Sequence, residues 1–152
     1  MKKTENNCKA EITIYSTQHD ISEETTETIY TGEYRFLAGT HVISYDEYFQ
    51  EEGSTPSKTT SLIKINENFI HIAKKGTITT QMHFDTCKTY QGNYQTPFGS
   101  FAMLIDTEQI SVNEQENEIL ADFTYHLSLN HCPVSKCTIQ IRIKKGAKSF
   151  QA

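Results

Sequence analysis

Apolar and polar residues alternate with a period of two along most of the chain. The clearest example is 119–129, where the odd positions are apolar and most even positions are polar. This period is that of a strand that buries one face. The same alternation recurs at short, regular intervals and predicts about ten strands, at 8–16, 28–36, 41–48, 59–65, 69–74, 78–84, 90–94, 101–105 with 110–112, 119–129 and 138–144.

The segments between these strands have the composition of turns and loops. Asn66-Glu67-Asn68, Lys75-Gly76 and Thr96-Pro97-Phe98-Gly99 are typical of tight turns, and 113–118 and 130–135 are expected to be polar loops. Segment 50–57 is the longest expected loop. One buried face per strand indicates an antiparallel meander, and closure would remove the exposed edges of so many strands. The sequence therefore predicts an all-β fold, a single antiparallel up-and-down barrel of about eight to ten strands.

Length and composition support one β domain over residues 1–152, with a core at 8–146 and short flexible termini. Ile, Val and Thr total 39 of the 152 residues, whereas Leu and Ala total 13, a balance that favours strands over helices. The chain has neither an apolar run that could form a transmembrane helix nor an apolar stretch typical of a secretory signal. We therefore expect a cytoplasmic protein whose four cysteines are reduced thiols.

The charge pattern argues against two classes of partner. The net charge is −5 and only two arginines are present, so the chain lacks the basic surface that neutralises nucleic-acid phosphates. Its few lysine clusters accompany no amphipathic helix, as membrane attachment would require. We expect neither a nucleic-acid nor a membrane partner.

No arrangement of residues specifies a catalytic or metal site. His126, His131, Cys132 and Cys137 are of zinc-ligand types, but their spacing matches no common zinc module. The acidic group Asp46, Glu47, Glu51 and Glu52 is more typical of a solvated strand end than of an acid/base pair. Cys87, followed by Lys88, is interpreted as an ordinary thiol in a turn. We therefore predict no catalytic residues, no metal and no cofactor, and an enzyme is the least favoured class.

Several segments in order along the chain resemble the YwiB-like family, small bacterial proteins with a domain of unknown function. They are 34–48 (YRFLAGTHVISYDEY), 63–65 (IKI), 75–76 (KG), 82–84 (MHF) and 94–99 (YQTPFG). The resemblance runs from about residue 10 to 146, and the Tyr-x-Thr-Pro-x-Gly turn is its most specific part. It implies a calycin-like, that is lipocalin-like, barrel and no established activity. Where the family usually has Arg shortly before the glycine at 76, this chain has Lys74, which is not equivalent for bidentate anion binding.

A barrel of this size either encloses a ligand or is filled by side chains. The leading hypothesis is a small-molecule binding module, because pockets combine apolar walls with a few converging polar groups. Its candidate ligand-binding residues, in or directly beside the resembling segments, are Tyr34, Tyr45, Glu47, Lys74 and Tyr94. In the alternative, the tyrosines pack the core, Lys74 lies on the surface, and the packed barrel is a structural or interaction module that self-associates through a strand edge or segment 50–57.

Overall fold

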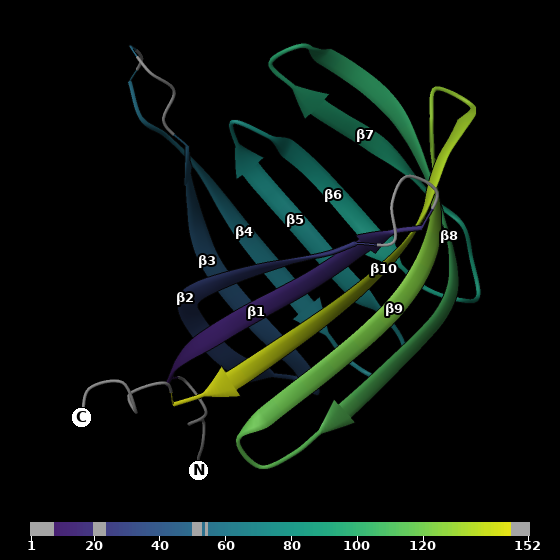
Figure 1. Cartoon of the computed structure of the whole chain (residues 1–152). Coiled ribbons are helices and arrows are strands. Elements are labelled where there is room, and N and C mark those ends of the chain that lie inside the picture. The colour runs from purple at the N-terminus through teal and green to yellow at the C-terminus, as the bar shows by residue number, and fades with distance from the viewer. Residues whose placement is uncertain (1–7, 20–23, 50–52, 54, 147–152) are drawn as a thin grey trace.

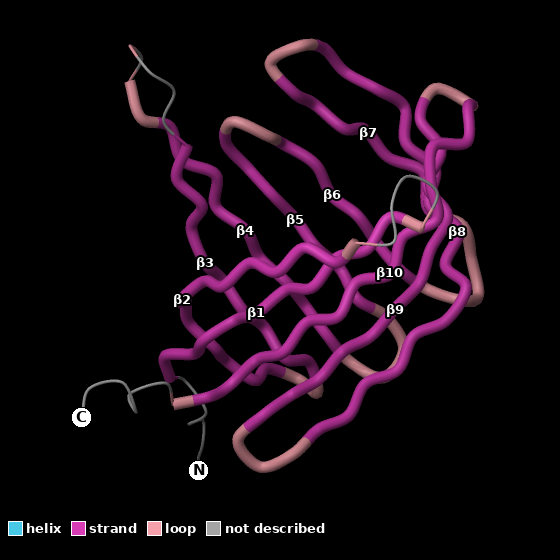
Figure 2. The backbone as a smooth tube through the Cα atoms, in the orientation of Figure 1, coloured by secondary structure: helices cyan, strands magenta, loops and turns pink. Residues whose placement is uncertain are grey.

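The structure is a computed structural model and describes residues 8–19, 24–49, 53 and 55–146. Ten antiparallel strands form one closed barrel in which each strand pairs with its neighbours in sequence and β1 pairs with β10 (Figures 1 and 2). The predicted all-β barrel is thus confirmed. The strands are β1 (Cys8–Gln18), β2 (Thr25–Leu37), β3 (Thr40–Phe49), β4 (Ser57–Ile65), β5 (Ile70–Gly76), β6 (Thr79–Phe84), β7 (Tyr90–Thr96), β8 (Gly99–Glu114), β9 (Glu118–Leu129) and β10 (Cys132–Lys145).

One end of the barrel, which we call the lower end, is packed with branched and aromatic side chains. It carries the β2–β3, β4–β5 and β8–β9 turns, which lie at the bottom of Figure 1. The core of large, fully buried side chains includes Phe84 and Phe123, whose ring centroids are 4.6 Å apart. The isoleucines Ile12, Ile43, Ile63, Ile65, Ile70, Ile105, Ile119, Ile141 and Ile143 are buried with them. This core provides the main hydrophobic stabilisation of the fold.

The opposite, upper end carries the β5–β6 and β7–β8 turns and is less tightly closed. Strand β2 pairs with β3 only between 33–37 and 40–44, next to the β2–β3 turn, so these two strands are unpaired towards the upper end. Several apolar residues that pack on the core near this end are only partly buried, among them Tyr30, Tyr94, Leu127 and Leu129. Solvent therefore reaches part of the barrel interior here.

Two sequence predictions differ from the structure. The expected loop at 130–135 is wrong, because β10 begins at Cys132 and accommodates Pro133 with a register shift between Pro133 and Ser135. The residues that we assigned to 101–105 and 110–112 lie in one long strand, β8, which has a register shift between Thr107 and Gln109. Such bulges insert an extra residue and interrupt the two-residue alternation without ending the strand. No helix within the described residues is long and apolar enough to cross a membrane.

Candidate functional site

Three of the five predicted site residues lie in one row across the sheet. The strand registers pair Tyr45 with Ser61, Ser61 with Lys74 and Lys74 with Thr80. Thr80 then pairs with Tyr94, and Tyr94 with Phe101. Directly paired residues project to the same face, so this row of six residues lines the barrel wall from β3 to β8. Tyr45, Ser61 and Thr80 are buried, which shows that the row faces inwards.

Glu47 and Lys74 form an ion pair next to this row. The Lys74 Nζ donates to Glu47 Oε2 at 2.5 Å, and the side chains are only 25% and 15% exposed, respectively. The Ser61 hydroxyl donates to the same carboxylate oxygen at 3.0 Å and accepts from Lys74 Nζ at 3.3 Å. The Tyr30 hydroxyl donates to Glu47 Oε1 at 3.4 Å. Both carboxylate oxygens therefore have donors, as a buried charge requires.

Two tyrosines form the apolar wall beside the ion pair. Tyr30 of β2 stacks on Tyr45 of β3 with ring centroids 4.3 Å apart, and Lys74 Nζ lies 6.0 Å from the Tyr45 ring centre. Burial, and then the charge of Glu47, raises the pKa of Tyr45. The pKa of Tyr30 is raised by the same two causes. Both phenols therefore remain neutral at physiological pH and can donate hydrogen bonds.

Tyr34 does not belong to this group. Its hydroxyl is hydrogen-bonded to His41 Nδ1 at 2.8 Å, and His41 Nε2 is hydrogen-bonded to Glu114 Oε2 at 2.9 Å. Tyr34 is only 2% exposed, and Lys145 Nζ lies 5.1 Å from its ring centre. Burial, followed by the nearby Cys8 and Glu114, raises the pKa of Tyr34 to about 12. This chain of hydrogen bonds connects the β2–β3 hairpin to β8, so the structure assigns Tyr34 to the closed lower end.

The other candidate clusters are not brought together. His126 pairs with Lys136, Cys132 pairs with Leu129, and no three His, Cys, Asp or Glu side chains form a metal-binding group among the described residues. Of the acidic group, Asp46 accepts a hydrogen bond from Thr60 at 3.0 Å, while Glu51 and Glu52 lie outside the described residues. Our interpretation of Glu47 as solvated was wrong, because its side chain is mostly buried beside Lys74.

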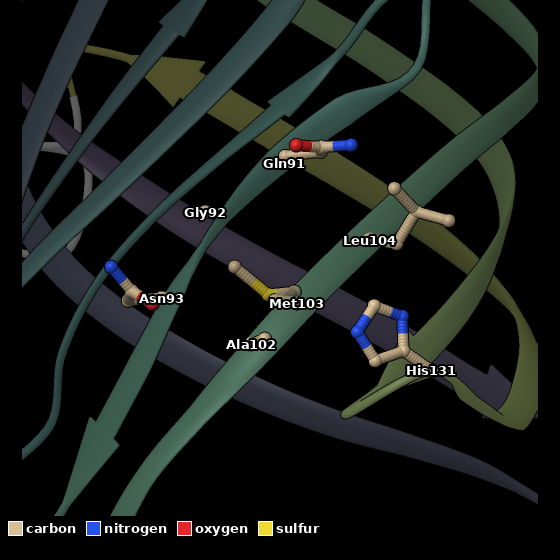
Figure 3. Close-up of a pocket in the computed structure, with 7 residues that line it drawn as sticks. All are labelled: Gln91, Gly92, Asn93, Ala102, Met103, Leu104 and His131. Atoms are coloured by element: carbon tan, nitrogen blue, oxygen red, sulfur yellow. The ribbon is translucent and has the colours of Figure 1, made fainter.

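Two pockets lie near this row of residues, and neither Glu47 nor Lys74 lines them. One, of about 450 Å³, adjoins the β7–β8 hairpin and is shown in Figure 3. It is lined by Gln91, Gly92, Asn93, Ala102, Met103, Leu104 and His131. The other, of about 290 Å³, lies where β2 and β3 separate and is lined in part by Tyr45, Asp46 and Tyr48. Their volumes are close to the lower limit of pockets for drug-sized ligands.

Sequence reasoning missed two members of the polar cluster, Tyr30 and Ser61. Tyr30 lies on the same alternating face as Tyr34, and Ser61 on the same face as Ile63. A tyrosine or serine at an inward position among apolar residues is the only signal that could have indicated them. Which side chains they meet depends on the register between strands, which the pattern within one strand does not specify.

Comparison with known proteins connects this barrel to a family. A family model described as a domain of unknown function (DUF1934) matches residues 12–141. The chain belongs to the DUF1934 family. The crystal structure of the ywiB protein from Bacillus subtilis superimposes with a TM-score of 0.77 at 17% sequence identity, over 94% of this chain and 95% of that one. At this identity the similarity shows the fold alone. A search of curated proteins found no match. Membership of DUF1934 thus confirms the predicted family and assigns no activity.

Proposed function

We propose that this DUF1934 protein is a cytoplasmic small-molecule binding module whose ligand enters at the upper end of the barrel. The ligand would contact Tyr45, Glu47, Lys74 and Tyr94 on the inner wall. Tyr34, which lies among the packed residues of the lower end, is not included in the proposed site.

The observation that carries this proposal is the partly buried Glu47–Lys74 ion pair on the inner wall. Removing two charges from water costs several kcal/mol per ion, and well-packed apolar residues of similar volume often stabilise a fold as well or better. A barrel with a purely structural role would therefore not require this ion pair in its interior. In a binding site, the same groups would provide orientation and specificity within an otherwise apolar wall.

The chemistry of the wall indicates the class of ligand. The partly buried Tyr94 offers an aromatic surface, the buried Tyr45 forms the apolar wall behind it, and Lys74 offers an ammonium group that a ligand anion could share with Glu47. Tyr30 and Ser61 already donate to Glu47, so this carboxylate keeps partners when Lys74 turns towards a ligand. We therefore propose a small acidic molecule with an aromatic or apolar body.

A fluorescent probe of this class, 1-anilinonaphthalene-8-sulfonate, tests the proposal. It should bind the native protein in an approximately one-to-one complex, and Lys74→Met should weaken binding about tenfold or more, since the loss of a charged hydrogen bond costs about 1.5–3 kcal/mol. Lys75→Met is the matched control, because Lys75 is the next residue of β5 and is exposed. Equal probe affinity in the two variants, with native circular dichroism for both, would contradict the proposed site.

A second candidate function, self-association, is favoured by one observation on the outer face. A pocket of about 400 Å³ is lined by Leu37, Val42, Leu62 and Phe69, flanked by the cations Arg35 and Lys64. Leu37 is 51% exposed, and exposed apolar groups of this kind mark association surfaces. If a second copy binds here, light scattering should show a dimer that Leu37→Glu converts to a monomer. A monomeric native protein at high micromolar concentration would rule this function out.

A further inference from the structure

Two histidines face each other across neighbouring strands, on the opposite side of the barrel wall from the Glu47–Lys74 ion pair. His71 of β5 pairs with His83 of β6, and their Nδ1 atoms are 3.0 Å apart. Their ring planes are inclined by 55°. Both residues alternate with buried, inward-facing neighbours such as Ile70 and Phe84, so the pair lies on the outer face of the barrel. Both side chains are partly exposed, which leaves them accessible from solvent.

The separation of the two nitrogens is compatible with their binding one metal ion. Imidazole nitrogens bind metals at about 2.0–2.1 Å, so two nitrogens in adjacent positions at 90° are about 2.9 Å apart, and at the tetrahedral angle about 3.3–3.4 Å apart. The observed 3.0 Å is the length of a hydrogen bond between the two rings, and it places the two nitrogens at a spacing that two adjacent ligands of one metal ion can adopt. Adjacent positions at 90° are those of square-planar or octahedral sites, which Cu²⁺ and Ni²⁺ favour over Zn²⁺.

From this geometry we infer that His71 and His83 form a two-histidine binding site for a divalent transition metal ion of the Cu²⁺ or Ni²⁺ type, with water completing the coordination shell. Without metal, one Nδ1 carries a proton and donates a hydrogen bond to the other Nδ1. On binding, that ring takes up its Nε2–H tautomer, and both Nδ1 lone pairs face the metal. No net proton release is needed when both rings are neutral.

The surroundings of the pair favour this ligand state. Burial, then the neighbouring His83 and Lys64, lowers the pKa of His71, so its ring is neutral near pH 7, as a metal ligand must be. The Phe69 ring packs 5.1 Å from that of His83, and Tyr90, from β7, lies 6.1 Å from it.

Lys64 has the opposite effect on metal affinity. It pairs with His71 from β4, so its ammonium group repels a cation bound between the histidines. We therefore expect Lys64→Gln to bind metal more tightly than the unsubstituted protein. This substitution is made on the exposed side of β4, so it should leave the fold intact.

Titration with Ni²⁺ tests the site, because Ni²⁺ is not reduced by the free thiols of Cys87 and Cys132. Calorimetry at pH 7.5 should give one ion per chain. His71→Ala and His83→Ala should each weaken binding about tenfold or more, since even the loss of a group that only supports a metal ligand costs 10–100-fold. The control His126→Ala, whose imidazole is about half exposed beside Glu108, should bind as the unsubstituted protein does.

A second measurement on the native protein removes any dependence on how the variants fold. Paramagnetic Ni²⁺ at substoichiometric concentration should broaden the ring proton signals of His71 and His83 before those of the other histidines. The inference is overturned if no Ni²⁺ binds, if both variants bind as the unsubstituted protein does, or if the first signals to broaden belong to other histidines.

Discussion

The Glu47–Lys74 ion pair provides the sharpest test of how the barrel interior is built. At 2.5 Å between Nζ and Oε2, and with an effective dielectric constant of about 20, two unit charges attract by about 6–7 kcal/mol. Removing each ion from water costs several kcal/mol, and this cost offsets most of the attraction. The net coupling that remains should be about 1–3 kcal/mol, the range found for residues in direct contact.

A double-mutant cycle with Lys74→Met and Glu47→Leu measures that coupling. Lys74→Met leaves Glu47 with the neutral donors Ser61 and Tyr30 in place of a charged one, so we expect it to lower the free energy of unfolding by about 2–3 kcal/mol. Glu47→Leu leaves the Lys74 ammonium without its carboxylate and should cost a similar amount. The double variant removes both charges and should be about 1–3 kcal/mol more stable than the sum of the single losses predicts.

Urea unfolding followed by circular dichroism is the assay, because the chain contains no tryptophan for fluorescence. Lys75→Met, on the exposed side of the same strand, should change the free energy of unfolding by less than about 0.5 kcal/mol. If the double variant equals the sum of the single variants within about 0.5 kcal/mol, Glu47 and Lys74 do not interact and the reasoning is refuted.

Three further predictions concern the rest of the barrel. Since the pKa of Tyr34 is raised to about 12 from 10.0, the native state holds this proton more tightly than the unfolded state, so the free energy of unfolding should fall as pH rises from 10 to 12. In urea unfolding across that range, the free energy of unfolding of Tyr34→Phe should fall less steeply with pH. An equal pH dependence in both proteins would contradict the raised pKa of Tyr34. Phe123→Ala should cost about 3–5 kcal/mol in the same assay, because Phe123 is fully buried, and a loss below 1 kcal/mol would show that the lower end is loosely packed. Gly32→Ala should lower the melting temperature sharply, because the new Cβ would lie 2.1 Å from the Ser44 carbonyl oxygen between β2 and β3; unchanged melting would mean that the two strands are not this close.

Much of the fold follows from local pattern. The alternation along 119–129 predicts β9 almost to the residue, because one face of each strand is buried and the other is not. The turn at 96–99 is likewise evident from its Pro and Gly. The pattern fails at Pro133, where a register shift lets the strand continue through a residue that usually ends one.

The site is harder to predict because its residues meet only through the register of several strands. Tyr45, Lys74 and Tyr94 lie in one row through four successive strand pairings, and a one-residue shift in any of them would send part of the row to the other face. The local sequence pattern likewise does not separate Tyr34 from Tyr45. It has the same residue type and the same inward direction as Tyr45, but its hydroxyl bonds with His41 towards the packed end.

Native mass spectrometry of gently purified protein tests the central claim, that the upper end of the barrel binds a small acidic molecule, most directly. We predict a discrete additional mass on the native protein that is lost on denaturation, absent from Lys74→Met and retained by Lys75→Met. The same spectra report the oligomeric state. A mass equal to the bare chain, both as purified and after incubation with a small-molecule extract, would contradict the claim, as would an additional mass that Lys74→Met retains.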